Sequence, residues 1–478
     1  MKKYFVPLIA FVFISFSFAQ EASESTAGLE DDLFGGDNEM VVTPEQANAE
    51  TKKDPLTAKG DLQTATLSLE NTKFRIGGSL NSELSLKYLW IDPYTPKGDH
   101  TKAFSNPEQA LLLPTLGANL FFDARPVQNL KLYGKFVFGF PFEKSLNGTA
   151  VAPPPLPPGT TVPVTVNGSP NIKIWELYTD FSAKDIAFFR FGKHTVKWGT
   201  GYFYSPADVI NISRINPQNP REDREGPVSL RTHIAIPRTQ YNIWLYLLPD
   251  TEQAKPQNTA AAGKAEFVFG NWELGIGGWY RYEKAPRFIT TLSGSIAGQV
   301  AVFAEGVFAW GSDHTYHKND AAFTPYKIIN KPFFQATAGL SYSNTKSNTS
   351  ISAQYYYNGF GYNTDTGVAS AAVKQSVVSA HAVGALQNIA AMGNRGQHYI
   401  ALSLSQNKLG TEKLSADLFQ QFAVTEREGL TTLSFNWKIY TFIHLSTGPS
   451  FSYPLSAASH TKGSIGYNLS VKLGGGRF

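Results

Sequence analysis

The sequence predicts an all-β chain that closes into a single transmembrane antiparallel β-barrel. Three observations support this fold class: short runs in which apolar residues alternate with small or polar ones, many aromatic residues and glycines, and little charge. The 478 residues include 41 Gly, 34 Phe and 22 Tyr, but only 17% are Asp, Glu, Lys or Arg. A soluble domain spends about a quarter of its residues on these four types. The combination is typical of an outer-membrane barrel.

The first segment has the pattern of an export signal. Two lysines precede an apolar run from Phe5 to Phe18, and Ser17 and Ala19 are small residues at the −3 and −1 positions. We therefore expect residues 1–19 to be a signal peptide that is cleaved after Ala19. The apolar run is too short for a spanning helix of about 20 residues.

The next segment, residues 20–72, is predicted to be an acidic, disordered periplasmic lead. From Glu21 to Glu50 it holds nine acidic residues and no Lys or Arg. Such a stretch cannot bury enough apolar surface to offset the entropy of ordering it. The predicted barrel, residues 73–478, follows.

The alternation is clearest in the last run of the chain. There Ile465, Tyr467, Leu469, Val471 and Leu473 alternate with small or polar residues. A water-soluble sandwich would also alternate, so the second face of each run decides. That face is small and polar rather than densely charged, as expected for a barrel with lipid outside and water inside.

Connections of two lengths give the strand count. Short turns such as Gly270-Asn271 contrast with long irregular segments at about 91–114, 141–170, 199–225, 311–331, 361–395 and 451–462. If long loops are extracellular and short turns periplasmic, each pair of long loops encloses an even number of strands. This predicts about 18 strands, with 16 as the alternative count, and both ends of the barrel on the periplasmic side.

Tryptophans near the run ends predict two aromatic girdles. Trp90, Trp198 and Trp310 lie near the upper ends of their runs, and Trp272 and Trp437 near the lower ends. Amphipathic rings prefer the two membrane interfaces. We expect all five to mark those interfaces.

Two long segments have unusual composition. Thr366 to Ala391 is rich in Ala and Val and has no Pro, which predicts a helical insertion in an extracellular loop, as a surface cap rather than a plug. Val151 to Val166 carries six prolines and predicts an extended, stiff surface arm.

The densest group of polar and charged residues lies between Gly199 and Glu225. Mixed charge with Gly and Pro suits a loop folded into an aqueous lumen, where opposed Arg and carboxylate groups create a field that orients polar solutes. Neighbouring runs also place arginines on their polar faces. The predicted constriction residues are Arg190, Asp208, Arg214, Arg221, Asp223, Arg224 and Arg231. The alternative is an exposed loop whose ion pairs satisfy one another.

The same stretch carries the motif W-G-x-G followed by P-x-D-x-x-N, at Trp198, Gly199, Gly201, Pro206, Asp208 and Asn211. In this it resembles large outer-membrane barrels of the alginate-export and porin-like type. The resemblance implies a barrel of about 18 strands that passes small hydrophilic or anionic solutes. An alginate-type conduit would need a strongly cationic lumen. The expected inward charges are only mildly cationic: Lys131, Lys135, Lys173, Arg190, Arg231, Lys264, Arg281 and Lys438 against Glu266, Glu273, Glu305 and Asp417.

The chain ends in an aromatic residue, Phe478. Outer-membrane barrels typically end in this way, so the resemblance implies recognition of Phe478 by the barrel-assembly machinery. Gly474 to Arg477 separate it from the alternating run and shift its register, which departs from the usual pattern.

Motifs for catalysis or metal binding are sparse. The absence of Cys excludes a disulfide scaffold and a Cys nucleophile, and the net charge of +4 is too weak for a nucleic-acid binder. No catalytic serine, zinc-protease or phosphate-loop motif occurs. Asp313, His314, His317 and Asp320 could hold a divalent metal, but a solvated polar loop is the preferred interpretation. We expect no catalytic site, metal or cofactor.

The sequence as a whole predicts an outer-membrane channel for passive diffusion of small hydrophilic solutes, narrowed by the 199–225 loop. Its expected partners are these solutes and the membrane lipid. Three alternatives stay open: a transporter for hydrophobic compounds, a surface adhesin or structural barrel, and an enzyme in the barrel rim.

Overall fold

The computed structural model describes residues 73–91, 93, 110–127, 129–140, 146–151, 161–166, 172–183, 186–317, 324–362, 396–455 and 463–477. Four predictions lie outside these residues: the signal peptide, the acidic segment 20–72, the helical insertion at 366–391, and the role of Phe478.

Eighteen strands of the described chain form one sheet, which confirms the predicted all-β class and the higher of the two strand counts. The first nine strands are β1 (Phe74–Ile91), β2 (Ala110–Val127), β3 (Leu130–Phe140), β6 (Ile172–Ala183), β7 (Ala187–Lys193), β8 (Val228–Ala235), β9 (Asn242–Leu248), β10 (Ala260–Phe269) and β11 (Trp272–Tyr280). The second nine are β12 (Arg287–Ile296), β13 (Val300–Trp310), β16 (Pro332–Asn344), β17 (Thr349–Asn358), β18 (His398–Gln406), β19 (Leu414–Ala423), β20 (Glu428–Tyr440), β21 (Ile443–Pro454) and β22 (Ser464–Arg477).

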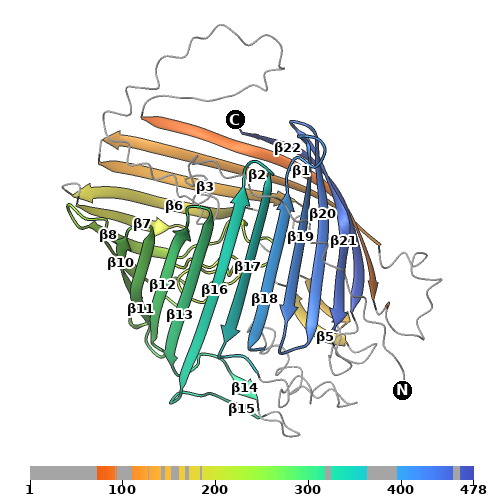
Figure 1. Ribbon diagram of the computed structural model, residues 1–478. Helices are drawn as coiled ribbons and strands as arrows, with labels where there is room; N and C mark the ends of the chain where they lie inside the picture. Colours follow the sequence, from red (N-terminus) through yellow and green to blue (C-terminus); the bar gives the residue numbers. More distant parts are fainter. Residues whose placement is uncertain are drawn as a thin grey trace.

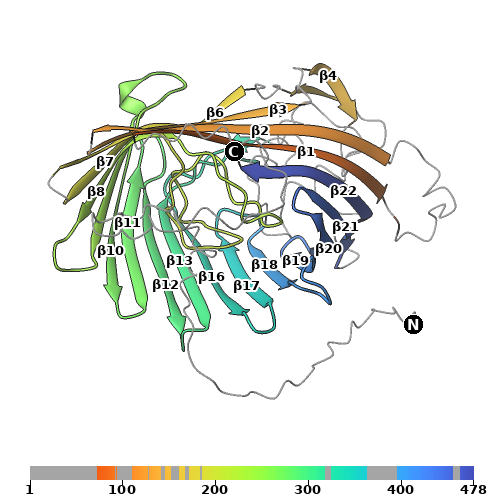
Figure 2. The same ribbon diagram turned by 90° about the horizontal axis from the view of Figure 1, so that it is seen from above.

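The sheet closes into a ring because its first and last strands pair. Each strand is antiparallel to its neighbour along the chain, and β1 pairs with β22 through contacts such as Leu84↔Val471 and Tyr88↔Tyr467. Figures 1 and 2 show the strands as a tilted ring seen from the side and from above. Closure leaves no free sheet edge, so the backbone groups of every strand find partners within the ring.

The long connections lie at one end of the ring, as predicted, although that end also carries the short turn 424–427 between β19 and β20. Short turns join β2 to β3, β6 to β7, β10 to β11, β16 to β17 and β20 to β21, whereas the long segments all leave the opposite end of the ring. At the β10–β11 turn Gly270 has φ of +60°, a left-handed conformation that glycine adopts without strain. The outer ends of β1 and β22 both lie at the short-turn end, in agreement with the predicted parity.

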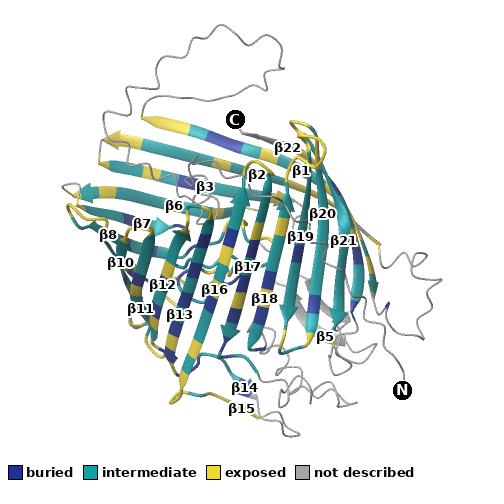
Figure 3. Ribbon diagram, viewed as in Figure 1, coloured by how far each residue is buried: buried dark blue, intermediate teal, exposed yellow. Residues whose placement is uncertain are grey.

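Burial alternates along the strands, most regularly on β13. Its odd-numbered residues from Ala301 to Ala309 are buried, whereas Phe308 and Trp310 on the opposite face are exposed. Figure 3 shows the same alternation of buried and exposed residues on the strands beside β13. Apolar residues on the outer face are exposed throughout the ring, among them Leu84, Leu120 and Leu340.

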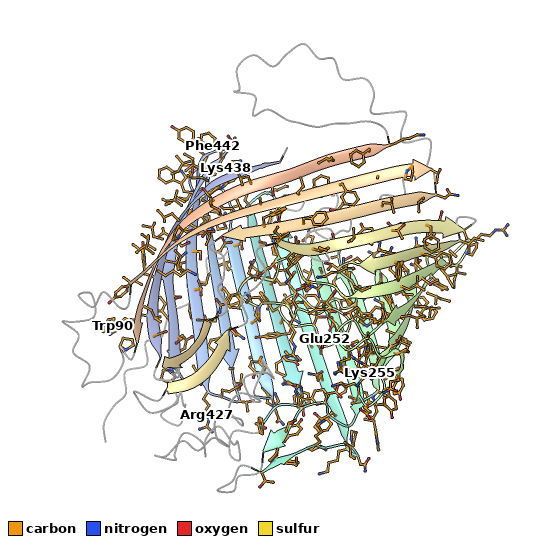
Figure 4. The ribbon with its side chains drawn as sticks, turned by 180° about the vertical axis from the view of Figure 1, so that it is seen from behind. Trp90, Glu252, Lys255, Arg427, Lys438 and Phe442 are labelled. Carbon is orange, nitrogen blue, oxygen red and sulfur yellow. The ribbon has the colours of Figure 1, made fainter. Side chains whose placement is uncertain are left out.

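A closed antiparallel ring with an exposed apolar outer face is the arrangement of a barrel that spans a bilayer. Trp310 and Trp437 are exposed near opposite ends of the barrel, as expected for the two girdles. Figure 4 shows Lys438 and Phe442 at one end of the barrel and Arg427 at the other.

In the described part of the chain, no helix combines the length and the hydropathy that crossing a membrane would require.

Two small hairpins stand apart from the barrel. β4 (Leu146–Val151) pairs with β5 (Thr161–Val166), and β14 (Tyr316–His317) pairs with β15 (Pro325–Tyr326). Within the predicted arm from Val151 to Val166, residues 161–166 form a strand paired with residues 146–151, and residues 152–160 lie outside the described residues. Composition could not show this pairing, because the partner strand precedes the proline-rich stretch.

Candidate functional site

The segment between β7 and β8, residues 194–227, lies inside the ring of strands, where Figure 2 shows it as an irregular coil. We call it the luminal loop. Its hydrogen bonds reach inward-facing side chains of strands far apart around the ring, including β3, β10, β13, β17 and β19. The loop that the sequence predicted to fold into the barrel therefore does so.

The outgoing arm of the loop is held first by apolar packing. Val196, Trp198, Ala207 and Ile210 form a buried cluster with inner-face residues of the wall, which are Tyr246, Leu248, Ala260, Ala262, Ile289 and Val307. The Trp198 ring is 1% exposed, packs edge-on against Tyr246 and lies 5.1 Å from the Lys264 ammonium group. Its predicted place in an aromatic girdle is wrong, because the chain turns into the barrel before it reaches this residue.

A second apolar cluster holds the tip of the outgoing arm. Phe203 and Tyr204 pack on the inner faces of three other strands, against Tyr356, Tyr399, Ala401 and Phe419. The Tyr204 ring is stacked on Tyr356 with centroids 5.1 Å apart, and its hydroxyl accepts a hydrogen bond from Gln421 Nε2 at 2.7 Å. Burying an aromatic side chain of this size contributes about 1.5–3 kcal/mol.

Two polar wall residues bind the backbone between these clusters. The Glu305 carboxylate on β13 accepts hydrogen bonds from the backbone N–H groups of Thr200, Gly201 and Ala207 and from the Ser205 hydroxyl. The Gln354 amide on β17 accepts from Phe203 N at 2.6 Å and donates to the Tyr204 carbonyl at 2.6 Å. These contacts satisfy backbone groups that would otherwise be buried without partners.

The loop also binds to itself. The Asn211 side chain accepts from Val196 N at 2.9 Å and donates to the Val196 carbonyl, which closes the outgoing arm into a ring. The Asp208 carboxylate accepts from Asn211 Nδ2 and forms an ion pair with Arg224 on the returning arm. Most residues of the W-G-x-G and P-x-D-x-x-N motif thus shape this loop.

The returning arm is held by ion pairs to lysines of the wall. Asp223 binds Lys135 of β3 at 2.7 Å, and Glu225 binds Lys173 of β6 and Lys193 of β7, both at 2.6 Å. Partial burial raises the pKa of the Glu225 carboxyl, but the two ammonium groups outweigh this and hold the pKa below its ordinary value. Glu225 therefore carries a negative charge at neutral pH.

The predicted constriction residues fall into three groups. Arg190 and Arg231 are buried in the wall, where Arg190 binds Asp180 at 2.6 Å and Arg231 lies 5.5 Å from the Trp244 ring. The Asp208 side chain is 4% exposed and forms an ion pair with Arg224, so both residues belong to the scaffold of the loop.

Only three of the seven predicted residues are exposed on the loop surface: Arg214, Arg221 and Asp223, whose side chain is 69% exposed. The other four side chains are either buried in the wall or joined in the Asp208–Arg224 ion pair. Burial could not be read from charge alone, because each buried member has its partner on another segment of the chain.

Glu305 and Gln354 are the residues that sequence reasoning missed. Glu305 was expected to face inward, but its partners begin about 100 positions earlier in the chain. One pattern pointed to it: a lone Glu at an inward position of an apolar run, opposite a Gly-rich loop whose N–H groups need acceptors.

Asp313 and His314, two of the four residues that could have held a metal, contact other parts of the described chain. Asp313 binds Arg287 at 2.9 Å and accepts from Ala285 N, while the His314 ring packs edge-on against Phe360. Burial, together with the positive charges of Arg214 and Arg287, lowers the pKa of His314 to about 4. Asp320 lies outside the described residues, and within them no group of three or more His, Cys, Asp or Glu is arranged to hold a metal.

No protein-family model and no curated protein matches the sequence. Solved structures of outer-membrane proteins are similar over most of the chain. OccK8 (OprE) of Pseudomonas aeruginosa is 11% identical, with 84% of this chain and 98% of that chain covered and a TM-score of 0.45.

Two further structures give comparable values. The outer membrane protein opdK of Pseudomonas aeruginosa is 9% identical, with 84% and 99% of the chains covered and a TM-score of 0.46. OmpT of Vibrio cholerae is 10% identical, with 85% and 99% covered and a TM-score of 0.39. At such identities and TM-scores the fold assignment rests on the strand pairing described above: eighteen strands of the described residues form a closed antiparallel β-barrel with an exposed apolar outer face.

Proposed function

We propose that the protein is an outer-membrane channel through which small hydrophilic solutes diffuse passively. The observation that carries the proposal is the luminal loop inside an eighteen-stranded ring. Rings of 16 to 18 strands leave an interior too wide for wall side chains to fill. A loop that crosses such an interior narrows the aqueous path.

The exposed charges of the loop define the constriction in this proposal. Arg214, Arg221 and Asp223 supply the mixed charge that acts on a passing solute, whereas Asp208 and Arg224 hold the loop in shape. Arg190 and Arg231 stiffen the wall behind it. The proposal involves no catalytic residue, metal or cofactor.

The described interior fits a hydrophilic solute better than a hydrophobic one. The buried apolar residues of the inner wall, such as Ile289 and Val307, lie in a cluster with the luminal loop. Transport of a hydrophobic compound would need apolar inner-wall residues that the solute can reach.

Export and assembly complete the proposal. Cleavage after Ala19 would deliver the chain to the periplasm, with the acidic segment 20–72 remaining there, and Phe478 would engage the assembly machinery.

Planar-bilayer recording of refolded protein tests the function. We expect stable conductance steps with weak ion selectivity. A silent bilayer, obtained with protein that still shows the heat-dependent mobility of a folded barrel, would refute the channel and would favour an enzyme at the rim or an adhesin.

A further inference from the structure

The Glu305 carboxylate lies on the inner face of β13 and is 4% exposed. Its neighbours on that face, Phe303 and Val307, are buried and apolar. None of the ion pairs among the described residues involves Glu305. A carboxylate in such surroundings is costly to bury unless hydrogen-bond donors surround it.

The luminal loop supplies those donors. Oε1 accepts from Thr200 N at 2.5 Å, Gly201 N at 2.6 Å and the Ser205 hydroxyl at 2.9 Å. Oε2 accepts from Ala207 N at 2.9 Å and from the same hydroxyl at 3.2 Å. A backbone N–H can only donate, so both carboxylate oxygens act as acceptors.

Glycine makes this approach sterically feasible. A Cβ on Gly199 would lie 2.5 Å from Glu305 Oε1, and a Cβ on Gly201 would lie 1.9 Å from the Tyr204 carbonyl oxygen. The loop backbone can therefore approach the carboxylate this closely because residues 199 and 201 have no side chain. The loop and the Glu305 carboxylate depend on each other. The carboxylate accepts from buried N–H groups of the loop, and these N–H groups stabilise the buried carboxylate.

We infer that Glu305 is the positioning residue of the constriction. Through Thr200, Gly201 and Ala207 it fixes the outgoing arm of the luminal loop, and thereby the place of the exposed charges further along that loop. It acts through the loop and makes no contact with the solute. This inference goes beyond the proposed channel function. It rests on that function because the constriction is defined only if the barrel is a channel.

The chemistry requires a carboxylate rather than an amide. Glu305→Gln has nearly the same shape, but an NH₂ group replaces one of the two carboxylate oxygens. Each oxygen now accepts from a backbone N–H, so the NH₂ group would face a donor in either orientation. One loop donor would then be buried without an acceptor. Glu305→Asp keeps two acceptor oxygens on a shorter side chain, so it should restore part of the contact.

The test follows both loop mobility and current. The chain has no Cys, so Gln218→Cys on the exposed part of the loop provides one site for a spin label. In Glu305→Gln and Glu305→Ala we expect a more mobile label and about tenfold more time in altered conductance levels, with Glu305→Asp intermediate. Glu83→Gln is the matched control, because it removes one inner-face carboxylate on β1 and should leave the label mobility unchanged.

Heat-dependent mobility on gels verifies that each variant is a folded barrel. If the label and the conductance levels of folded Glu305→Gln equal those of the parent protein, Glu305 does not position the loop. An equal rise in mobility in Glu83→Gln would likewise overturn the inference. A silent parent channel would refute the proposed function alone, since the label still reports on Glu305.

Discussion

The Arg224 guanidinium forms an ion pair with the Asp208 carboxylate, sixteen positions earlier, and so joins the two arms of the luminal loop. Asp208 is almost completely buried and also binds Asn211. Exposed ion pairs contribute only about 0–1 kcal/mol, but removing one partner of a buried pair is far more costly. This contact therefore sets the shape of the loop.

Removing two loop arginines should shift the selectivity of the channel towards cations. For Arg214→Ala combined with Arg221→Ala, two arginines exposed on the loop, we expect the cation-to-anion permeability ratio to rise about fivefold, since unit charges about 4 Å apart in water interact by roughly 1 kcal/mol. Reversal potentials in a salt gradient measure this ratio. Arg125→Ala, at the short β2–β3 turn, serves as the control. An unchanged ratio would show that the loop charges do not face the permeation path.

Acid should release the returning arm of the loop. The pKa of Glu225 is lowered from its ordinary value of 4.5, so its contribution to stability is fully present above that value and is lost as the pH falls through the lowered pKa. We expect single-channel current to be steady from pH 7 to about pH 5 and noisier below about pH 4.

Glu225→Gln should show the acid behaviour already at pH 7, because it cannot form the ion pairs with Lys173 and Lys193. Glu222→Gln, an exposed residue in the same arm, is the control and should behave like the parent protein. Equal noise in both variants at pH 7 would mean that the lysine contacts do not hold the arm.

Gly201→Ala should disturb the loop although it adds a single methyl group. That group would lie 1.9 Å from the Tyr204 carbonyl oxygen, so the backbone that donates to Glu305 must shift. We expect faster protease cleavage within the loop. Gly139→Ala on β3 is the matched control, because its added Cβ meets nothing within 4 Å. Similar cleavage rates in the two variants would contradict this packing.

Phe203→Ala should undock the tip of the loop and leave the barrel intact. Truncating a fully buried Phe costs about 3–5 kcal/mol, and here the loss falls on contacts between the loop and the inner wall. Hydrogen exchange should accelerate at the N–H groups of Thr200, Gly201 and Ala207, with strand amides unchanged. Phe308→Ala removes an exposed outward ring of β13 and should affect neither set. Faster exchange throughout the strands would instead show that Phe203 stabilises the barrel itself.

The barrel itself could be predicted from the sequence because its rules are local. Alternation with period two identifies a strand, and a turn such as Gly270-Asn271 marks its end, so eighteen strands followed from runs of about ten residues. The luminal loop depends on contacts between distant segments. A tryptophan at the end of a run has the same local pattern whether the chain stops at the interface, as at Trp310, or turns inward, as at Trp198.

The candidate site could be predicted only in outline for the same reason. The sequence showed which segment carries the charges. It did not show that Asp208 binds Arg224 of the same loop, or that Arg190 binds Asp180 on the neighbouring strand. Glu305 is the clearest example, since its role depends on four donors of the loop between β7 and β8, about 100 positions earlier in the chain.

The luminal loop begins and ends on neighbouring strands that pair directly, with Lys193 opposite Val228. The luminal loop is consequently an insertion between two paired strands. Deleting it would join β7 to β8 by a short hairpin turn and leave the backbone hydrogen bonds between the strands of the ring in place. The width of the proposed channel could then be changed by exchanging this one loop. Ile289, Val307 and Ala401 would become exposed to water and would have to be replaced by hydrophilic side chains. Natural variants could diversify permeability by the same route, without any change to the scaffold.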